Sequence, residues 1–161
     1  MNCADFLVYD VTSPSFLRWK ISPSRNVRAG SPAGHFGSYH GYYRVKFGGQ
    51  DVLAHRIVWV LHNGPIPQGM QIDHIDGDRT NNDVRNLRLA SVSQNLQNQK
   101  CSVRSTSGVK GLRWAKSSQL WEGSVQYAGR RVYHTSADRG AVERWLVETR
   151  VRLHGQFARH A

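Results

Sequence analysis

The sequence has few of the residues that would place it in a disulfide, zinc or membrane class. Its 161 residues include only two cysteines, Cys3 and Cys101, and neither belongs to a CxxC pair. A zinc ribbon, a zinc finger and a dense disulfide framework are therefore disfavoured, and a reducing cytosol suits both thiols. No stretch approaches the roughly 18 consecutive apolar residues of a membrane span, and the N-terminus lacks the basic and apolar regions of an export signal. We expect a soluble, cytoplasmic protein with no membrane partner.

Acidic residues are also scarce. Asp and Glu number 11 against 22 Lys and Arg, which gives a formal net charge of +11. A chain this basic favours a polyanion as partner, because phosphates neutralised by Lys and Arg release their condensed counterions. Hydrophobic residues make up 39% of the sequence. That content is enough for one modest core or two small ones and argues against wholesale disorder.

The N-terminal part contains a hairpin pattern followed by a helical one. The strand-like runs YYRVKF and DVLAHR flank Gly48-Gly49, which predicts a β-hairpin with a two-residue turn. From His55, the run HRIVWVLHNG has apolar residues close to helical spacing and stops at Asn63-Gly64. This pattern predicts a short helix.

The stretch MQIDHIDGDRTNNDVRNLRLASVSQNLQNQ follows and has a different pattern. It begins with strand-like MQID and continues with a polar loop that contains Gly77 and a second strand-like run, LRLA. Ser91 fits a helix N-cap, and helix-compatible residues come after it. The order strand, loop, strand, helix predicts a compact ββα unit at about residues 70–99.

The C-terminal part has the pattern of a separate module. CSVRSTSG is polar and aperiodic, and we place a linker at residues 101–107. VKGLRWA, LWEGSVQY and RRVYHT then predict three strands, the last two joined at Ala128-Gly129. Asp138 can cap a helix that ends before Gly155 and whose apolar positions recur at three- and four-residue steps. We therefore expect a small three-stranded sheet with one helix over residues 108–161.

The ββα stretch concentrates residues that suit phosphodiester hydrolysis. Cutting such a bond needs an activated water and a cation that neutralises charge in the transition state. His74 is the side chain best suited to take a proton from water near neutral pH, because the ordinary pKa of histidine is about 6.5. Asp73 precedes it on the strand and points to the opposite side. Carboxylate and amide oxygens are hard ligands that suit Mg²⁺ or Mn²⁺.

IDHIDGDRTNNDVRNLRLASVSQN resembles the HNH (His-Asn-His) nuclease motif, in the variant found in phage and intron-encoded homing endonucleases. The resemblance implies that His74 is the general base and that Asp73 and Asn95 bind one divalent cation, Mg²⁺ or Mn²⁺, beside the scissile phosphate. Asn95 stands where other branches have the last His, which favours a hard metal over zinc. The resemblance also implies that Asn86 ties the loop together and orients His74 through hydrogen bonds.

The flanking segments extend the resemblance over nearly the whole chain. The residues before the motif are similar to the N-terminal portion of these phage nucleases, and SGVKGLRWAKSSQLWEGSVQYAGRRVYHTS resembles the Apetala-type (ERF-like) DNA-binding domain. In that domain a three-stranded sheet enters the major groove, so basic side chains and indoles on alternating strand positions can reach DNA. Trp114 is one candidate, whereas Trp121 is better explained as core. The basic DNA contacts expected are Arg113, Lys116, Arg130 and Arg131.

Several residues have plainer explanations. Residues 76–78 are good turn chemistry, so loop structure is favoured over metal ligation, and Asn81 and Asn82 are also expected to belong to the loop. His55 and Arg56 lie at the head of a helix and could contact the phosphate backbone or the active site. For Arg56, DNA contact and no role at all are equally good interpretations.

Together these patterns predict an α+β chain with two modules. Residues 1–100 form an HNH nuclease module of the ββα-metal type with an N-terminal hairpin and helix, and residues 108–161 form an Apetala-type DNA-binding domain. The expected function is metal-dependent cleavage of double-stranded DNA by a phage-encoded hydrolase of the homing type, acting in the bacterial host cell. One site per chain implies nicking by a monomer, unless a dimer forms or two events follow each other. A DNA-binding regulator without catalysis and an RNA-directed or non-specific nuclease stay open as alternatives.

Overall fold

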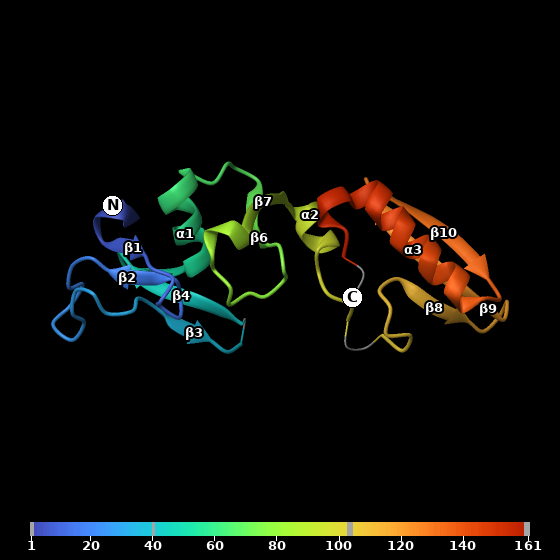
Figure 1. Cartoon of the computed structure of the whole chain (residues 1–161), viewed down its shortest axis with the longest axis horizontal. Helices are drawn as coiled ribbons and strands as arrows, with labels where there is room; N and C mark the ends of the chain where they lie inside the picture. Colours follow the sequence, from blue (N-terminus) through green and yellow to red (C-terminus); the bar gives the residue numbers. More distant parts are fainter. Residues whose placement is uncertain (1, 40, 103–104, 160–161) are drawn as a thin grey trace. The chain divides into compact units, whose positions relative to one another are not determined.

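The chain divides into two compact units. The computed structural model describes residues 2–39, 41–102 and 105–159 (Figure 1). The first unit is Met1–Val92 and the second is Ser93–Ala161. The division falls inside the helix α2, Val92–Gln97, whereas the sequence places the module boundary at residues 101–107. Residues 103 and 104 of that linker lie outside the described residues, and the boundary between functional modules stays a prediction.

Small antiparallel sheets build the first unit. Its strands are β1 Leu7–Tyr9, β2 Leu17–Trp19, β3 His35–Gly37, β4 Tyr42–Phe47, β5 Gln50–Leu53, β6 Met70–His74 and β7 Leu87–Ser91. β1 pairs with β2, β4 lies between β3 and β5, and β6 pairs with β7. The helical segments are α1, Ala54–Asn63, and the 3₁₀ turns Cys3–Asp5 and Val84–Asn86. The α+β character expected from the sequence is confirmed.

The predicted hairpin and the helix after it are both present. Phe47 pairs with Gln50, so β4 and β5 are joined by Gly48 and Gly49 alone. Both glycines have positive φ, 56° and 78°, a conformation that residues with a Cβ adopt only with strain. α1 follows β5 directly and ends at Gly64, whose φ is 80°.

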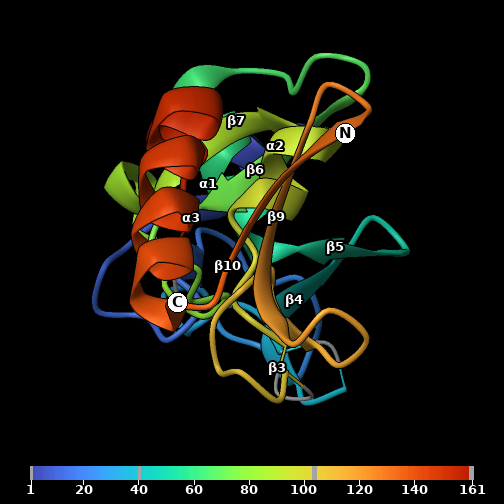
Figure 2. The ribbon, with the colours of Figure 1, turned by 90° about the vertical axis from the view of Figure 1, so that its right-hand side faces the viewer.

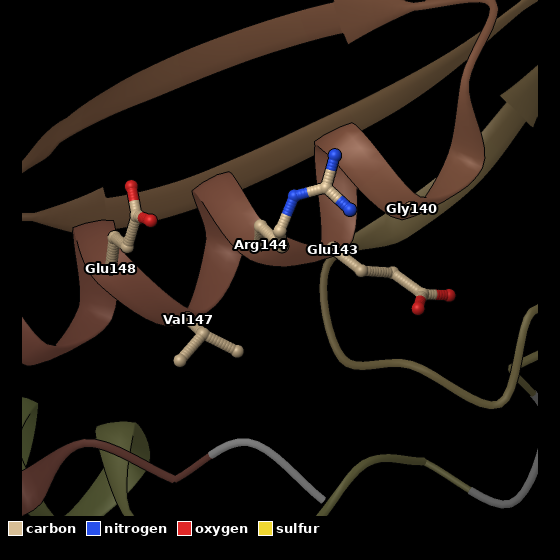
Figure 3. A pocket seen from close by; sticks show the side chains of 5 residues that line it. All are labelled: Gly140, Glu143, Arg144, Val147 and Glu148. Carbon is tan, nitrogen blue, oxygen red and sulfur yellow. The ribbon is translucent and has the colours of Figure 1, made fainter.

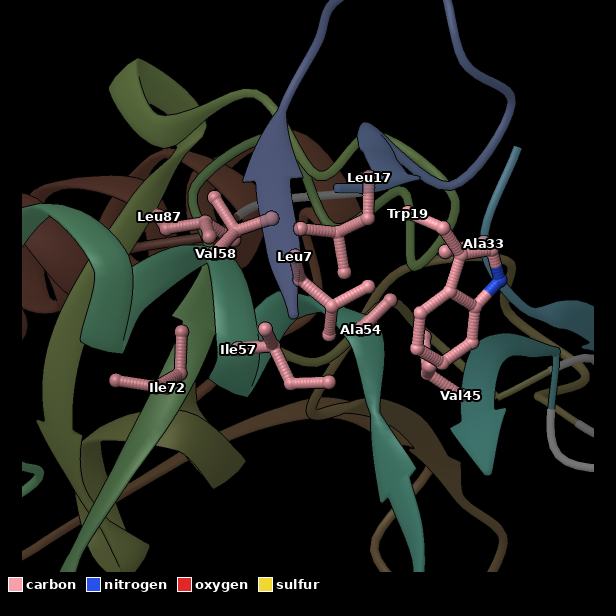
Figure 4. Close-up of a cluster of buried hydrophobic side chains, with 10 residues drawn as sticks. All are labelled: Leu7, Leu17, Trp19, Ala33, Val45, Ala54, Ile57, Val58, Ile72 and Leu87. Atoms are coloured by element: carbon pink, nitrogen blue, oxygen red, sulfur yellow. The ribbon is translucent and has the colours of Figure 1, made fainter. Parts of the chain in front are cut away.

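The core of the first unit connects the N-terminal strands to the ββα strands (Figure 4). α1 buries Ala54, Ile57 and Val58, positions that fall on one face of the helix. Ile72 of β6 and Leu87 of β7 belong to the same cluster. Each such side chain contributes about 1.5–3 kcal/mol when fully buried. The strands that carry the candidate site are therefore fixed by the same core that holds α1.

The order strand, loop, strand, helix predicted for residues 70–99 is confirmed by β6, β7 and α2. In the β6–β7 pair, Ile72 lies opposite Leu89, Asp73 opposite Arg88 and His74 opposite Leu87. The loop between the strands includes the 3₁₀ turn that ends at Asn86. This register places Asp73 and His74 at the end of β6 where the loop begins.

The second unit has the predicted three strands and helix (Figures 1 and 2). Its elements are β8 Leu112–Ala115, β9 Leu120–Tyr127, β10 Arg130–Ser136, α3 Arg139–His154 and the 3₁₀ turn Gly155–Phe157. β9 is the central strand, and the turn at Ala128-Gly129 joins it to β10. Asp138 caps α3 by accepting a hydrogen bond from the Gly140 amide at 2.8 Å.

α3 packs closely against β9. A side chain at Gly123 would lie 2.6 Å from Cγ1 of Val142, so this approach requires glycine. Leu112, Val125, Val142 and Leu146 form the small core between the sheet and the helix. Among the described residues, no helix combines the length and the apolar character needed to cross a membrane.

Candidate active site

A buried amide holds His74 at the end of β6. His74 is 4% exposed, and its Nε2 lies 3.1 Å from Oδ1 of Asn82, which is 1% exposed. Nδ2 of Asn82 donates to the carbonyl oxygen of Ser15 at 3.2 Å. Because a carbonyl oxygen only accepts, this bond orients the amide with its oxygen toward His74, so the imidazole donates from Nε2. Nδ1 is therefore the ring nitrogen that can take a proton from water.

The surroundings of His74 keep it neutral near physiological pH. Burial lowers the pKa of His74 below the ordinary value, while the hydrogen bond to Asn82 and the carboxylates of Asp76, Asp73 and Asp78 act in the opposite direction. The net effect is a lowered pKa. A neutral imidazole at pH 7 is the form that a general base needs.

Asp73 forms a buried ion pair across the β6–β7 sheet. Nε of Arg88 donates to Oδ2 of Asp73 at 2.9 Å, and Nη2 of Arg88 lies 2.8 Å from the same oxygen. The side chains of Arg88 and Asp73 are 12% and 5% exposed. The guanidinium therefore offsets the charge of the carboxylate and fixes its orientation. Arg88 was not among the residues expected at the site, although the register of a β6–β7 hairpin places it opposite Asp73.

Asn86 ties together the loop between β6 and β7. Its Nδ2 donates to Oδ1 of Asp76 and to the carbonyl oxygen of Asn81, both at 2.9 Å, and its Oδ1 accepts from the Asp76 amide at 3.1 Å. These bonds hold the loop together, and a role of Asn86 in catalysis stays a prediction. The bond to Nε2 of His74 comes from Asn82, which the sequence analysis had assigned to the loop alone.

Residues 76–78 form the turn that their sequence predicts. Gly77 has a φ of 68°, and Oδ1 of Asp76 accepts from the Asp78 amide at 2.8 Å. Burial would raise the pKa of Asp76, but hydrogen bonds from Asn81, the Asp78 backbone and Asn86 outweigh it, and the pKa is lowered. Hydrogen bonds from Thr80 lower the pKa of Asp78. Both carboxylates are therefore ionised and engaged in holding the loop.

The donor groups of the motif suit a hard cation better than a closed metal cage. Among the described residues, no group of three or more His, Cys, Asp or Glu side chains could hold a metal ion. Mg²⁺ does not require such a group, because it keeps several waters and is commonly held by one or two carboxylates plus substrate phosphate. A carboxylate such as that of Asp73 and an amide oxygen such as that of Asn95 belong to this class of donors, and their joint binding of one cation stays a prediction. Asn95 lies in α2, on the side of the division that belongs to the second unit.

Two further rings lie beside His74. His55, in the first turn of α1, has its ring centroid 4.9 Å from that of His74, with the planes at 79°. The ring of Tyr42, on β4, lies 5.2 Å from His55 and 6.0 Å from His74. Burial lowers the pKa of His55 to about 3, and the neighbouring His74 and Arg56 add to this effect. The sequence left the role of His55 open, and the structure places it at the site.

The remaining basic candidate of the first unit is exposed. Arg56 follows His55 in the first turn of α1 and is exposed to solvent. Its neighbour places it close to the His55–His74 pair in sequence and in the fold. A contact between Arg56 and DNA stays a prediction.

The candidate DNA contacts of the second unit are divided between the two faces of the sheet. Gly123 faces α3, and pairing places Trp114, Trp121 and Arg130 on that same face. Trp121 belongs to the small core, as the sequence favoured. Arg113 and Arg131 are on the opposite face, and Lys116 lies in the turn after β8.

An ion pair already engages one of these arginines. Arg113 donates from Nε and Nη2 to the two carboxylate oxygens of Glu122 at 3.0 and 2.9 Å. The Arg113 side chain is 69% exposed, so the pair lies at the surface, where such pairs contribute little stability. A contact between Arg113 and a phosphate would replace this pair and stays a prediction.

A hollow on the exposed side of α3 contains none of the candidate catalytic residues. It is lined by Gly140, Glu143, Arg144, Val147 and Glu148 (Figure 3). Glu143 accepts from Nε of Arg139 at 2.7 Å, and Nη2 of Arg144 lies 3.6 Å from Oδ2 of Asp138. These charged groups are occupied by ion pairs along the helix, and the catalytic candidates lie elsewhere.

Known proteins resemble this chain in the region that carries the site. The profile of the family described as HNH endonuclease matches residues 52–97. Protein 3.8 of Escherichia phage T7 is 47% identical over 122 residues, which are 76% of this chain and 96% of the phage protein. No solved structure gives a significant match.

Two other relatives match over shorter segments, about a third of their own length. A protein of the SPbeta prophage of Bacillus subtilis (strain 168), provisionally named HNH homing endonuclease YosQ, is 44% identical over 55 residues, or 34% of this chain and 32% of that protein. The uncharacterized HNH endonuclease L560 of Acanthamoeba polyphaga mimivirus is 38% identical over 72 residues, or 44% of this chain and 36% of that protein. With the ββα order and the buried His74 at the end of its first strand, these similarities show that the chain belongs to the HNH endonuclease family, in its phage type.

Proposed function

We propose that this protein is a metal-dependent DNA endonuclease that hydrolyses phosphodiester bonds with His74 as general base. The observation that carries the proposal is the hydrogen-bond chain from Ser15 through Asn82 to Nε2 of His74. It leaves Nδ1 as the basic nitrogen on a ring whose pKa is lowered. A neutral, oriented imidazole is what proton abstraction from water requires.

The other motif residues have supporting roles. Asp73 and Asn95 would hold one divalent cation, Mg²⁺ or Mn²⁺, which when bound supplies positive charge to the phosphate and the leaving oxygen. Arg88 orients the Asp73 carboxylate through their ion pair. Asn86 holds the loop from which Asn82 reaches His74. Water loses its proton to Nδ1 of His74, and the resulting hydroxide attacks phosphorus while the bond from phosphorus to the 3′-oxygen breaks. The 3′-oxygen leaves and takes a proton from solvent water.

The second unit is proposed to hold the DNA as an Apetala-type domain. Arg113 and Arg131 share the sheet face that is turned away from α3, and a sheet face of this kind can enter a major groove. Lys116, Arg130 and Arg56 are proposed as contacts to the phosphate backbone. The formal net charge of +11 favours such binding.

We also propose a homing role, which rests on the provisional name of the prophage relative. One catalytic site per chain makes a nick the direct product. Cleavage of both strands would require a dimer or two successive events. The protein would act on DNA inside the bacterial host.

The test is nicking of supercoiled plasmid in the presence of Mg²⁺. Wild type and the surface control His35→Ala are expected to convert supercoiled into open circular DNA, and His74→Ala is expected to lose this activity while it still shifts DNA in a gel. Equal cutting by wild type and His74→Ala would refute the assignment of the base. Binding without cutting by all three proteins would favour the catalytically inactive regulator.

The target preference needs a separate comparison. Full-length protein and a chain truncated after residue 106 are compared on plasmids of different sequence. Loss of site preference on truncation supports a sequence-reading role for the second unit. Unchanged cleavage of all sequences by both proteins would indicate a non-specific nuclease.

A further inference from the structure

His55 is a buried polar group that the proposed chemistry does not yet use. The residue is 5% exposed, and Nδ1 has no hydrogen-bond partner among the described residues. Burying a polar nitrogen without a partner costs free energy, which an apolar side chain of similar size would avoid. The position of His55 therefore has to be explained by something other than stability.

The neighbouring ring of His74 indicates a role for His55 in the active site. The ring of His55 lies edge-on to that of His74, 4.9 Å away. Because the two ring centroids are only 4.9 Å apart, a phosphate bound beside the base lies next to the ring of His55. The ring of Tyr42 lies close to both, with its centroid 5.2 Å from His55 and 6.0 Å from His74.

The start of α1 adds a second attraction for an anion. His55 lies in the first turn of this ten-residue helix, whose N-cap residue, Leu53, makes no side-chain capping bond. Amide N–H groups at a helix N-terminus favour negative charge. Arg56, exposed and next in sequence, adds a formal positive charge to the same turn.

Another histidine of the same helix shows the contrast. The ring of His62 lies edge-on to Tyr9 at 4.6 Å, which resembles the contact between His55 and His74. Its Nδ1, however, lies 2.9 Å from the Val58 carbonyl oxygen. The polar atom of His62 is satisfied inside the protein, whereas that of His55 is not.

We propose that His55 is a second catalytic imidazole that donates a hydrogen bond to the scissile phosphate at the N-terminus of α1, beside His74. The inference rests on the proposed nuclease function. As a neutral donor, His55 stabilises charge that develops on a phosphate oxygen without placing a competing cation next to the base. The ligand is a phosphodiester of the DNA backbone, held between the first turn of α1 and the end of β6.

The test compares three variants under single-turnover conditions with Mg²⁺. His55→Phe keeps a packed ring and removes the donor, His55→Gln keeps an N–H donor, and His62→Phe is the matched control on the same helix. We expect His55→Phe to slow nicking on the order of tenfold to a hundredfold, as for one hydrogen bond to a charged group, with DNA affinity little changed. His55→Gln should retain more activity than His55→Phe, and His62→Phe should match wild type.

A binding measurement keeps this inference separate from the function on which it rests. The ¹⁵N signals of His55 are followed while duplex DNA is added in EDTA, and a shift absent from His62 is expected. A shift without any nicking by wild type would support the phosphate contact and refute the nuclease proposal. Nicking by wild type with His55→Phe equally fast, or with His55→Gln as slow as His55→Phe, would overturn the role of His55 alone.

Discussion

Replacing Asn82 by alanine tests the central hydrogen-bond chain of the site. Asn82 is 1% exposed and connects Nε2 of His74 to the Ser15 carbonyl oxygen at 3.1 and 3.2 Å. The substitution removes both bonds and leaves the imidazole N–H and the carbonyl buried. Each such group costs about 1–3 kcal/mol when it loses its partner, so we expect Asn82→Ala to lower the free energy of unfolding by about 2–6 kcal/mol.

The effect on catalysis should be larger than the effect on folding suggests. Asn82→Ala removes the bond that favours the proton on Nε2 of His74. The tautomer that carries the proton on Nδ1 cannot act as base through that nitrogen. Correct general-base catalysis contributes on the order of 10²–10⁴ in rate, so we expect the nicking rate to fall by about 10²-fold or more at full folding. DNA affinity should stay unchanged because Asn82 is buried.

The assay pairs this variant with Asn81→Ala. Asn81 is the neighbouring amide and bonds to Asp76 at 2.8 Å, so its loss perturbs the loop without removing the bond to His74. Nicking rates are measured with saturating DNA and Mg²⁺, and stability is measured by urea unfolding. A rate for Asn82→Ala within twofold of wild type, or an equal loss for Asn81→Ala, would refute the tautomer argument.

Three further outcomes are expected. Burial lowers the pKa of His74, and the base is lost as the pH falls through this lowered pKa. The acidic limb of the pH profile of nicking should therefore lie below pH 6.5. A midpoint at or above 6.5 would contradict this expectation. Asp73→Ala removes the carboxylate that pairs with the buried Arg88 and should lower the free energy of unfolding in urea by about 3–5 kcal/mol. Asp73→Asn keeps an acceptor and should lower it less, while nicking is lost in both variants. Equal stability of the two variants would count against the ion pair. Burial, with Arg150 and Arg159 nearby, lowers the pKa of Lys110 to about 8. The unfolded chain therefore binds more protons between about pH 8 and 10.5, and stability should rise with pH there; Lys110→Gln should flatten that rise in denaturation curves, and an unchanged slope would refute it.

Much of the fold could be predicted because its signals are local. The turns at Gly48-Gly49 and Ala128-Gly129 are marked by residues that adopt positive φ, and the ends of α1 and α3 are marked by Gly64 and Gly155. Such preferences act over a few residues and can be read in the sequence. The strand faces of the second unit could not be assigned as readily, since they depend on the register between β8, β9 and β10.

The sequence by itself determined the order of elements, the basic character of the chain and the identity of His74 as the candidate base, because these depend on composition, periodicity and a motif contained in one short stretch. Only the tertiary structure decided how that histidine is held. The bond between Asn82 and Ser15 joins residues 67 positions apart, and His55 reaches His74 from a different element. Contacts of this kind arise when the core brings β6 against α1 and the N-terminal strands. No local pattern of residues predicts them.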